Sequence, residues 1–458
     1  MQLGLGLGLT RIGGGSSLAR LLFTANEPGF TFEPWDITTL FQDRAGTTPV
    51  TAAGQSVGYR RDKSGRGNHQ VAVSDAKRGV YGWMPKTGRR NQLTYTEQFD
   101  NAAWTKDGAT VTANAVTAPD GTLTADTVST GISTGEHRIY QTAGSSAVHT
   151  HTIYAKAGTA NFVSLSTGNA TYYAVFNLST GAVSSSVSCT SSIVSVGDGW
   201  YRLTVTGSVA MPSFFFVVNV GETAASAVPA TGSTGTSKTV HLWGAQLELG
   251  STATAYQRVA SQYDITEAGV PTCYYVQADG VDDAYVTPTI TPNTDKVQVF
   301  AGVRKLSDAA TGVVLELSPS GDTNNGSFYF SVPSGVAGYD MNLGAGASGG
   351  QGRRATTYTA PINNVISLAV DRSLPTIADK IGFRVNAALP TLSSTGTTNV
   401  PTGNFLAYPL YIYARAGTSF PFNGLDFGHA VRFGPNLDAA TIARVESLIA
   451  RNTPGVTL

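Results

Sequence analysis

Short segments rich in strand-forming residues, separated by turns that contain glycine, run through most of the 458 residues of this chain. In residues 69–73 and 297–303, for example, Val, Phe and other β-formers alternate with small or polar residues. Only 13% of residues are charged, against roughly 25% in an average soluble domain, and glycine takes 52 positions. Because helix-forming Glu, Lys and Met are scarce, the composition predicts an all-β fold with many tight turns.

Length and charge narrow the class of protein further. A chain of 458 residues is too long for one compact core, so two or three domains are expected. Thirty basic residues balance thirty acidic ones, and basic clusters do not exceed pairs such as Arg60 and Arg61, so nucleic acid is not an expected partner. No apolar run approaches the roughly 20 residues of a membrane-spanning helix, so membrane insertion is not expected either. Cys189 and Cys273 fall in different predicted modules, which argues against a disulfide.

The first nine residues alternate leucine with small or polar residues, mostly glycine. In an extended strand this pattern puts every leucine on one face and leaves the other face flat. The segment also lacks the basic start and the cleavage site of a secretory signal peptide. We expect residues 1–22 to be an anchoring segment and hinge that pairs with another protein surface; a disordered tail is the alternative. The anchoring residues are Leu3, Leu5, Leu7 and Leu9.

Two short motifs about two hundred residues apart belong together. Residues 62–69 read DKSGRGNH, and residues 279–286 read DGVDDAYV. Together they resemble the paired signature of concanavalin A-like (laminin-G/pentraxin-type) lectin sandwiches, in which the two motifs lie close in sequence. The resemblance implies one sandwich, formed by residues 23–90 and 263–458, that is interrupted by a second module at residues 91–262. It also implies a structural turn role for Asp62, His69, Asp279, Asp282 and Asp283.

The inserted segment carries a second resemblance. Residues 91–99, 199–203 and 242–250 resemble parts of carbohydrate-binding-module-type jelly rolls, which are common in phage virion proteins. Strand-like segments separated by turns at spacings of about 8–12 residues fit a β-sandwich here. The predicted fold is therefore all-β: a concanavalin A-like sandwich with an inserted jelly-roll sandwich, an extended N-terminal anchor strand and one short C-terminal helix.

That helix is predicted from its own local signals. Asp438 is a suitable N-cap, and Leu437 and Ile442 are spaced as a hydrophobic staple. Ile442, Val445, Leu448 and Ile449 then form one apolar stripe at helical spacing. The helix is expected to pack on the sandwich.

Catalysis is not predicted, although the concanavalin A-like sandwiches that the chain resembles include glycosidases. Retaining glycosidases need two carboxyl groups about 5 Å apart, which a Glu-x-Asp-x-x-Glu run on one strand would supply. The chain has no such run: Glu316 stands alone, and the neighbours Asp282 and Asp283 point to opposite faces. A carboxylate pair drawn from distant loops stays open, and no catalytic residue is assigned.

Metal binding is considered at three places. The carboxylates of residues 279–283 could bind Ca²⁺, but capping of backbone N–H groups in a tight turn is the favoured interpretation. In jelly rolls of the type that the inserted segment resembles, a structural Ca²⁺ lies between the first and last strands, and Glu97 and Glu248 occupy suitable positions. His149 and His151 could ligate a metal, although a lone His-x-His more often has a surface or cross-strand role. No other cofactor is expected.

Sugar binding requires aromatic faces that stack on pyranose rings, with polar groups beside them. Tyr172, Tyr173 and Trp104 are the candidates, the two tyrosines being the preferred pair, and Trp200 and Trp243 are expected in the core.

The sequence therefore predicts a non-enzymatic phage structural protein of the virion surface, a tail-fibre, head-fibre or head-decoration component for assembly and host adhesion. Its expected partners are other virion proteins, host-surface glycans and, in a homotrimer, two further copies of itself. A secreted bacterial lectin or adhesin and a polysaccharide depolymerase are the alternatives.

Overall fold

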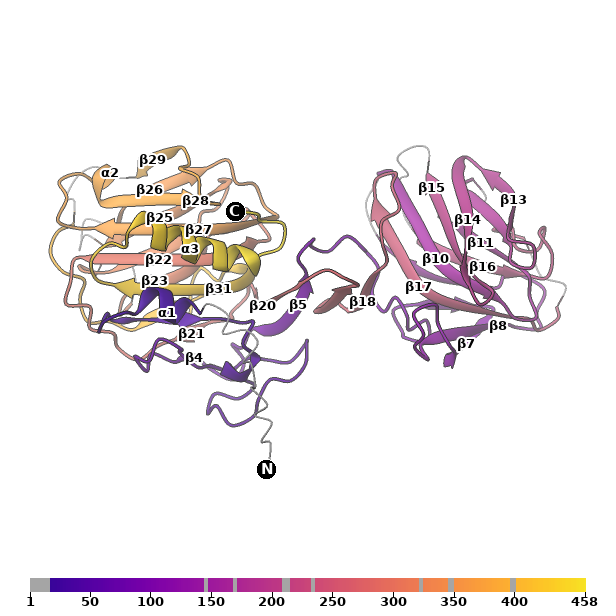
Figure 1. Cartoon of the computed structure of the whole chain (residues 1–458), viewed down its shortest axis with the longest axis horizontal. Coiled ribbons are helices and arrows are strands. Elements are labelled where there is room, and N and C mark those ends of the chain that lie inside the picture. The colour runs from indigo at the N-terminus through magenta and orange to yellow at the C-terminus, as the bar shows by residue number, and fades with distance from the viewer. Residues whose placement is uncertain are drawn as a thin grey trace, which may run out of the picture. The chain divides into compact units, whose positions relative to one another are not determined.

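The computed structural model describes residues 17–143, 147–167, 171–207, 215–231, 235–320, 324–344, 350–395 and 401–458. The chain forms two compact units: one combines Met1–Lys86 with Thr272–Leu458, and the other is Thr87–Pro271 (Figure 1). We call them the host unit and the inserted unit. The inserted unit extends beyond the predicted limits of 91 and 262 at both ends, and the predicted anchor strand lies outside the described residues.

The host unit contains two antiparallel sheets, which we call A and B. Within the host unit, sheet A has the strand order β5 (Val80–Pro85), β20 (Thr272–Asp279), β31 (Asn423–Phe433), β22 (Lys296–Lys305), β27 (Ile362–Asp371) and β28 (Ile381–Val385), and β1 (Gly29–Phe32) also pairs with β31. Sheet B has the order β2 (Leu40–Phe41), β3 (Tyr59–Arg60), β4 (Gln70–Ala72), β21 (Tyr285–Val286), β30 (Leu410–Ile412), β23 (Gly312–Leu317), β24 (Phe328–Val332), β25 (Gly338–Gly344), β26 (Gly350–Thr356) and β29 (Leu392–Thr395).

The apolar core of the host unit lies between these two sheets. Val299 and Leu368 reach it from sheet A, and Leu315, Phe330 and Met341 reach it from sheet B. All five side chains are at most 1% exposed. The prediction of an all-β sandwich is confirmed.

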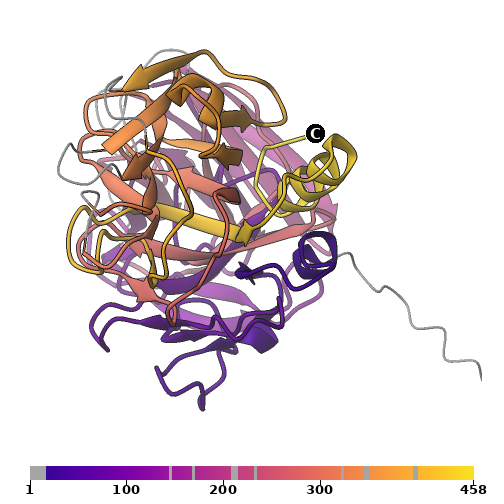
Figure 2. The same ribbon diagram turned by 90° about the vertical axis from the view of Figure 1, so that its left-hand side faces the viewer.

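Helices are few and short. They are α1 (Leu18–Leu22), the 3-10 helix η1 (Ile37–Thr39), α2 (Ile377–Lys380) and α3 (Ala439–Arg451). The predicted C-terminal helix is confirmed, because Asp438 caps α3 by accepting a hydrogen bond from Thr441 N–H at 2.8 Å. Helix α1 packs beside α3 on the side of sheet A that faces away from the core, where they share an apolar cluster with Phe300 and Val365 (Figure 2). None of the described helices is long and apolar enough to cross a membrane.

A buried polar network joins the two sequence segments of the host unit. Asp426 accepts hydrogen bonds from the Tyr413 hydroxyl at 2.7 Å and from Gly428 N–H at 2.9 Å, and His429 Nδ1 lies 2.7 Å from its carboxylate. From the first segment, the Arg60 guanidinium lies 3.9 Å from the Asp426 carboxylate. Burial alone would raise the pKa of Asp426, but its contacts with His429, Arg60 and Tyr413 hold that pKa below its usual value.

The inserted unit also contains two antiparallel sheets, C and D, and one hairpin. Sheet C has the order β13 (Ala182–Val187), β12 (Tyr173–Asn177), β11 (Phe162–Ser166), β16 (Phe215–Gly221), β9 (Arg138–Thr142) and β6 (Thr105–Asp107). Sheet D has the order β14 (Cys189–Gly197), β15 (Trp200–Gly207), β10 (His149–Ala157), β17 (Thr239–Leu249), β8 (Ala125–Thr130) and β7 (Ala109–Val116). The hairpin consists of β18 (Gln257–Ser261) and β19 (Asp264–Glu267). Val163, Phe176 and Val218 from sheet C meet Ile153 and Leu203 from sheet D in a second core.

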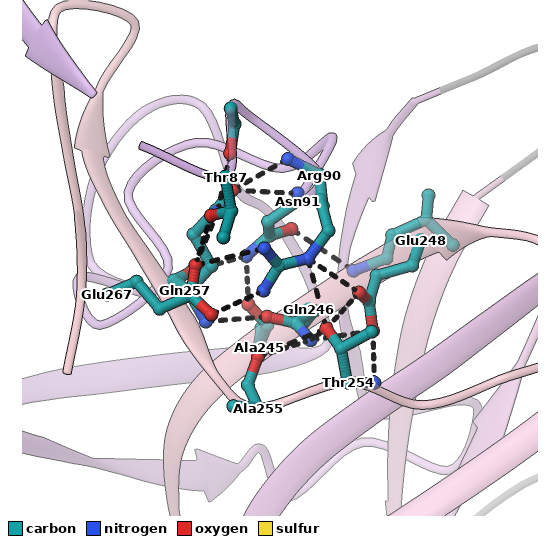
Figure 3. A network of polar contacts seen from close by, with 12 residues as sticks. Thr87, Arg90, Asn91, Ala245, Gln246, Glu248, Thr254, Ala255, Gln257 and Glu267 are labelled. Carbon is teal, nitrogen blue, oxygen red and sulfur yellow. Dashed lines mark hydrogen bonds and ion pairs between the residues drawn. The ribbon is translucent and has the colours of Figure 1, made fainter. Parts of the chain in front are cut away.

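A polar network ties the two ends of the inserted unit together (Figure 3). Arg90 donates two hydrogen bonds to Glu267, at 2.8 and 2.9 Å, and its Nε lies 3.6 Å from Glu248. Asn91 donates to the carbonyls of Ala245 and Gln257, both at 3.0 Å. The segment that enters this unit is thus bonded to the segment that leaves it, which explains why the unit starts before residue 91 and ends after residue 262.

Candidate functional site

The outer face of sheet C, the face turned away from the core, carries aromatic and small polar side chains in register. Val163, Val218 and Phe216 point into the core, so strand alternation turns their neighbours outward. The pairing Tyr140↔Val217, Val217↔Ser166 and Ser166↔Tyr173 then forms one row across four strands. Tyr140 and Tyr173 stand at the two ends of this row, three strand spacings or about 14 Å apart.

A second row runs beside the first. The pairing Arg138↔Asn219, Asn219↔Ser164 and Ser164↔Val175 places polar groups at three adjacent positions. Asn219 donates a hydrogen bond from Nδ2 to Ser164 Oγ at 3.2 Å. The Asn219 side-chain carbonyl Oδ1 is buried and has no partner among the residues that the structure describes. An amide oxygen in this condition costs stability unless a ligand or water satisfies it.

Burial separates the floor of this face from its flanks. Ser164, Ser166, Val217 and Asn219 are at most 3% exposed, whereas Tyr140 and Tyr173 are half-buried. One end is closed by the chain itself, since a Cβ at Gly221 would lie 2.4 Å from Ala227 N. The face therefore offers a floor of small side chains between two tyrosines.

Charge is concentrated at one edge of the same face. Arg138 is held by Asp107 at 3.1 Å and by Glu136 at 2.9 Å, and its guanidinium lies 5.3 Å from the centre of the Tyr140 ring. These contacts fix Arg138 beside the tyrosine while its remaining N–H groups stay available to hydrogen-bond acceptors. We call Arg138, Tyr140, Ser164, Ser166, Tyr173 and Asn219 the sheet C face.

The predicted sugar-binding residues divide between this face and the core. Tyr173 lies on the sheet C face, and Tyr172 directly precedes it, with its carbonyl accepting from Thr167 N–H at 3.3 Å. Both tyrosines are half-buried. The prediction for Trp104 is wrong: this side chain is 1% exposed, packs edge-on against Phe99 at 4.9 Å, and donates its indole N–H to the Tyr95 carbonyl. A ring enclosed in this way cannot present a face to a sugar.

The two other tryptophans of the inserted unit are buried, as expected. Trp200 is 2% exposed and Trp243 is 5% exposed, and they share an apolar cluster with Ala118 and Ala125. Their indole N–H groups donate to Thr117 O at 3.1 Å and to Thr124 Oγ1 at 3.0 Å. Both therefore have structural roles.

The predicted calcium ligands of the inserted unit have separate arginine and hydrogen-bond partners. Glu97 accepts from the Tyr256 hydroxyl at 3.1 Å and from Arg258 at 3.3 Å, and burial raises its pKa despite that arginine. Glu248 accepts from Gln246 Nε2 at 2.7 Å and from Thr254 N–H at 3.1 Å, next to Arg90. Each carboxylate already has an arginine beside it, so the residues present do not fit a shared Ca²⁺ site between them.

The first lectin-type motif forms an ordered loop around Asp62. The Asp62 carboxylate accepts backbone hydrogen bonds from Thr31 at 3.1 Å, Ser64 at 2.8 Å and Asn68 at 3.1 Å. His69 Nδ1 accepts from Asp62 N–H at 3.0 Å. Asp62 and His69 therefore organise the turn, which is the arrangement that a structural role requires.

The second motif behaves in the same way. Asp279 accepts from the backbone of Val281 at 2.8 Å and of Asp282 at 3.3 Å, while Asp283 accepts from Asp279 N–H at 3.0 Å. Burial raises the pKa of Asp283 to about 6. Among the described residues, the ligand atoms of these three carboxylates form the one group of potential metal ligands within 4.8 Å of one another. Their backbone contacts are those of a capped turn, and calcium binding stays a prediction.

Glu316 and the two histidines of the His-x-His pair are buried. Glu316, at 0% exposure, accepts from Ala416 N–H at 2.9 Å and lies 3.6 Å from Arg415. His149 and His151 are both at most 1% exposed, so neither has the surface role considered for it. Cys189 and Cys273 are free thiols, as expected. The anchor residues Leu3, Leu5, Leu7 and Leu9 lie outside the described residues.

Sequence reasoning missed Tyr140, Asn219 and Ser164. Alternation was the available signal: residues 138–142 and 215–221 each alternate between core residues and outward residues. Without the pairing of β9 with β16 and of β16 with β11, however, nothing in the sequence indicates that these positions share one row.

No protein-family model matches the chain, and no curated protein matches it in sequence. Among solved structures, the CBM40 domain of a Ruminococcus gnavus IT-sialidase matches with 14% identity and a TM-score of 0.27, over 34% of this chain and 84% of that one. The same domain bound to alpha2,3 sialyllactose gives the same values. Domains LG4-5 of the mouse laminin alpha1 chain match with 12% identity and a TM-score of 0.23, over 64% of this chain and 87% of that one. TM-scores this low carry no argument about function.

Proposed function

We propose that this chain is a non-enzymatic, glycan-binding structural protein of a phage virion, and that the sheet C face is its binding site. The observation that carries the proposal is the row Tyr140–Val217–Ser166–Tyr173 with the polar row beside it. Two tyrosines flank a floor of small side chains, and Asn219 brings an unsatisfied amide oxygen to that floor.

This combination suits a sugar because a pyranose ring has apolar C–H faces and a polar rim. Tyrosine rings can stack on the C–H faces, while Arg138, at the edge of the row, donates to a sugar hydroxyl. Small-molecule sites usually combine a few polar groups with many apolar and aromatic ones, and the sheet C face has this composition. The floor is buried, so sugar rings would enter from the exposed edges of Tyr140 and Tyr173.

Adhesion rather than catalysis is the proposed activity. The described group of three neighbouring carboxylates, in the Asp279 turn, accepts backbone hydrogen bonds and belongs to the host unit. The carboxylates beside the sheet C face, Asp107 and Glu136, are both paired with Arg138. We further propose that residues 1–9 anchor the chain to other virion proteins and that the protein acts as a homotrimer, which would strengthen weak glycan contacts by avidity.

The test measures binding of the full-length protein to an array of bacterial surface glycans. Each stacking face is worth about 1 kcal/mol, so the variant with both Tyr140→Ala and Tyr173→Ala should bind its best glycan more than about tenfold more weakly. Tyr263→Ala, a half-buried tyrosine of the same unit that lies in the β18–β19 hairpin, serves as the matched control and should bind normally.

Release of reducing ends is measured in the same samples. A constant level is expected, and steady release would identify a depolymerase instead. Unchanged affinity in the double tyrosine variant, or an equal loss in Tyr263→Ala, would contradict the proposed site.

A further inference from the structure

The host unit has an apolar pocket of about 380 Å³ on the side of sheet A that also carries α3. Its walls include Phe300, Leu392 and Ile442, the last from the first turn of α3. Leu389 stands on its rim with 81% of its side chain exposed. This leucine extends the apolar surface of the pocket to its rim.

The floor of the pocket is made of small residues on adjacent strands. Ala369 of β27 pairs with Gly382 of β28, and both line the pocket. A Cβ at Gly382 would meet nothing closer than Ala369 O at 3.7 Å, so the space above this glycine is open. The pocket therefore results from missing side chains on the sheet rather than from a gap between elements.

Two polar groups in the pocket have no partner. The Ser367 hydroxyl, on a residue only 6% exposed, and Arg353 Nε are both buried without a hydrogen bond among the described residues. An occupant with apolar side chains would fill the pocket, and its backbone groups would pair with the Ser367 hydroxyl once that hydroxyl turns toward it.

One segment of this chain has that composition and can reach the pocket. Leu3, Leu5, Leu7 and Leu9 would share one face of an extended strand, and its backbone groups would be unpaired. Helix α1 contacts α3, and Leu21 shares an apolar cluster with Leu448 and with the pocket residue Ile442. Crossing α3 requires about 10–12 Å, whereas the eight Cα–Cα steps from Ser17 to Leu9 span up to about 27 Å.

We infer that, in the isolated protein, the leucine-rich segment of residues 3–9 docks in this pocket of its own chain. Its leucine face covers Phe300, Leu389 and Ile442, and its backbone meets the Ser367 hydroxyl. Extended segments bind other proteins in the same way, through main-chain hydrogen bonds and pockets for alternate side chains. The inference is independent of the glycan-binding proposal.

Disulfide trapping in the full-length protein tests the inference. Leu3, Leu5, Leu7 and Leu9 are replaced by Cys one at a time, each together with Leu389→Cys, in a background with Cys189→Ser. The matched control puts the second cysteine at Leu406, another exposed leucine of the host unit, 44% exposed, that does not line the pocket. Docking raises the local thiol concentration, so at least one Leu389 pair should cross-link within the monomer about tenfold faster than its Leu406 counterpart.

A second variant fills the pocket. Gly382→Leu has room for its side chain at an ordinary φ and should slow the Leu389 cross-link about tenfold while the melting temperature stays unchanged. Equal rates at Leu389 and Leu406 would overturn the inference. So would cross-links found only between two molecules, or a Leu389 cross-link unaffected by a folded Gly382→Leu protein.

Discussion

The host unit and the inserted unit are both two-sheet sandwiches, but they close in different ways. The host unit is assembled from two distant segments, and the network that joins them is sealed inside, with Arg60 and Asp426 each 1% exposed. The inserted unit is one continuous segment, and its closing network lies partly in solvent, with the Arg90 side chain 26% exposed. In this chain the two segments of the interrupted sandwich meet at a buried ionic contact, whereas the two ends of the continuous unit meet at a partly exposed one.

The polar contents of the two cores differ as well. In the host core, Arg60 is compensated by Asp426 and by the ring of Tyr285, whose centre lies 3.5 Å from the guanidinium carbon. In the inserted core, His151 has neither ring nitrogen hydrogen-bonded among the described residues and stacks on Phe216 at 5.4 Å. The host core therefore contains a charged arginine, whereas the inserted core contains a histidine that burial keeps neutral.

The strongest test of this contrast is Arg60→Met. Arg60→Met removes the arginine partner of the buried Asp426 carboxylate and leaves it with His429, Tyr413 and Gly428, so the free energy of unfolding of the host unit should fall by about 3 kcal/mol. Scanning calorimetry of the full-length protein measures this as a lower transition for the host unit, with the transition of the inserted unit unchanged.

The neighbouring Arg61→Met is the matched control, because the Arg61 side chain is exposed and only borders the Phe41 ring at 5.1 Å. It should change stability by less than about 0.5 kcal/mol. The contrast between the two units would be contradicted if Arg60→Met left the melting transition of the host unit unchanged, or if both units melted in one cooperative transition.

A smaller effect is expected from His151→Leu in the inserted unit. Burial lowers the pKa of His151 to about 3, while the unfolded chain titrates near 6.5, so the unfolded state binds more protons between these values. The free energy of unfolding of the inserted unit is therefore unaffected by this histidine above about pH 6.5. It falls as the pH is lowered, by about 2 kcal/mol at pH 5.

The leucine variant lacks this proton linkage. The difference in unfolding free energy between variant and wild type should shift by about 2 kcal/mol in favour of the variant between pH 7.5 and pH 5. Chemical denaturation at the two pH values measures the shift, and the host transition in the same samples is the internal reference. A difference that does not change with pH would show that His151 titrates normally.

Features encoded locally could be predicted from the sequence. The all-β class followed from composition, and α3 followed from the Asp438 cap and the stripe that includes Val445 and Ile449. The turn roles of Asp62 and Asp279 followed from motifs in which each carboxylate caps backbone groups a few residues away. Hydrogen bonds between residues that are close in sequence produce short motifs, and such motifs can be recognised without the structure.

Features that depend on pairing between distant strands could not be predicted. Tyr140, Ser166 and Tyr173 share a row only because β9, β16, β11 and β12 are neighbours in sheet C. Trp104 was assigned to the surface because an aromatic residue in a turn-rich segment gives no sign of its burial against Phe216, more than one hundred residues away. The extra residues of the inserted unit were missed because Glu267 becomes part of it only through Arg90.

The most direct test of the account asks whether the inserted unit alone is the glycan-binding module. Residues 87–271, expressed with Arg90 and Glu267 retained, should melt cooperatively and bind the best glycan of the array with the affinity of one full-length protomer, as measured by calorimetric titration. Residues 91–262, which lack both ends of the closing network, should melt at a lower temperature. A folded 87–271 fragment that does not bind the glycan, while the full-length protein does, would assign binding to the host unit and contradict the account.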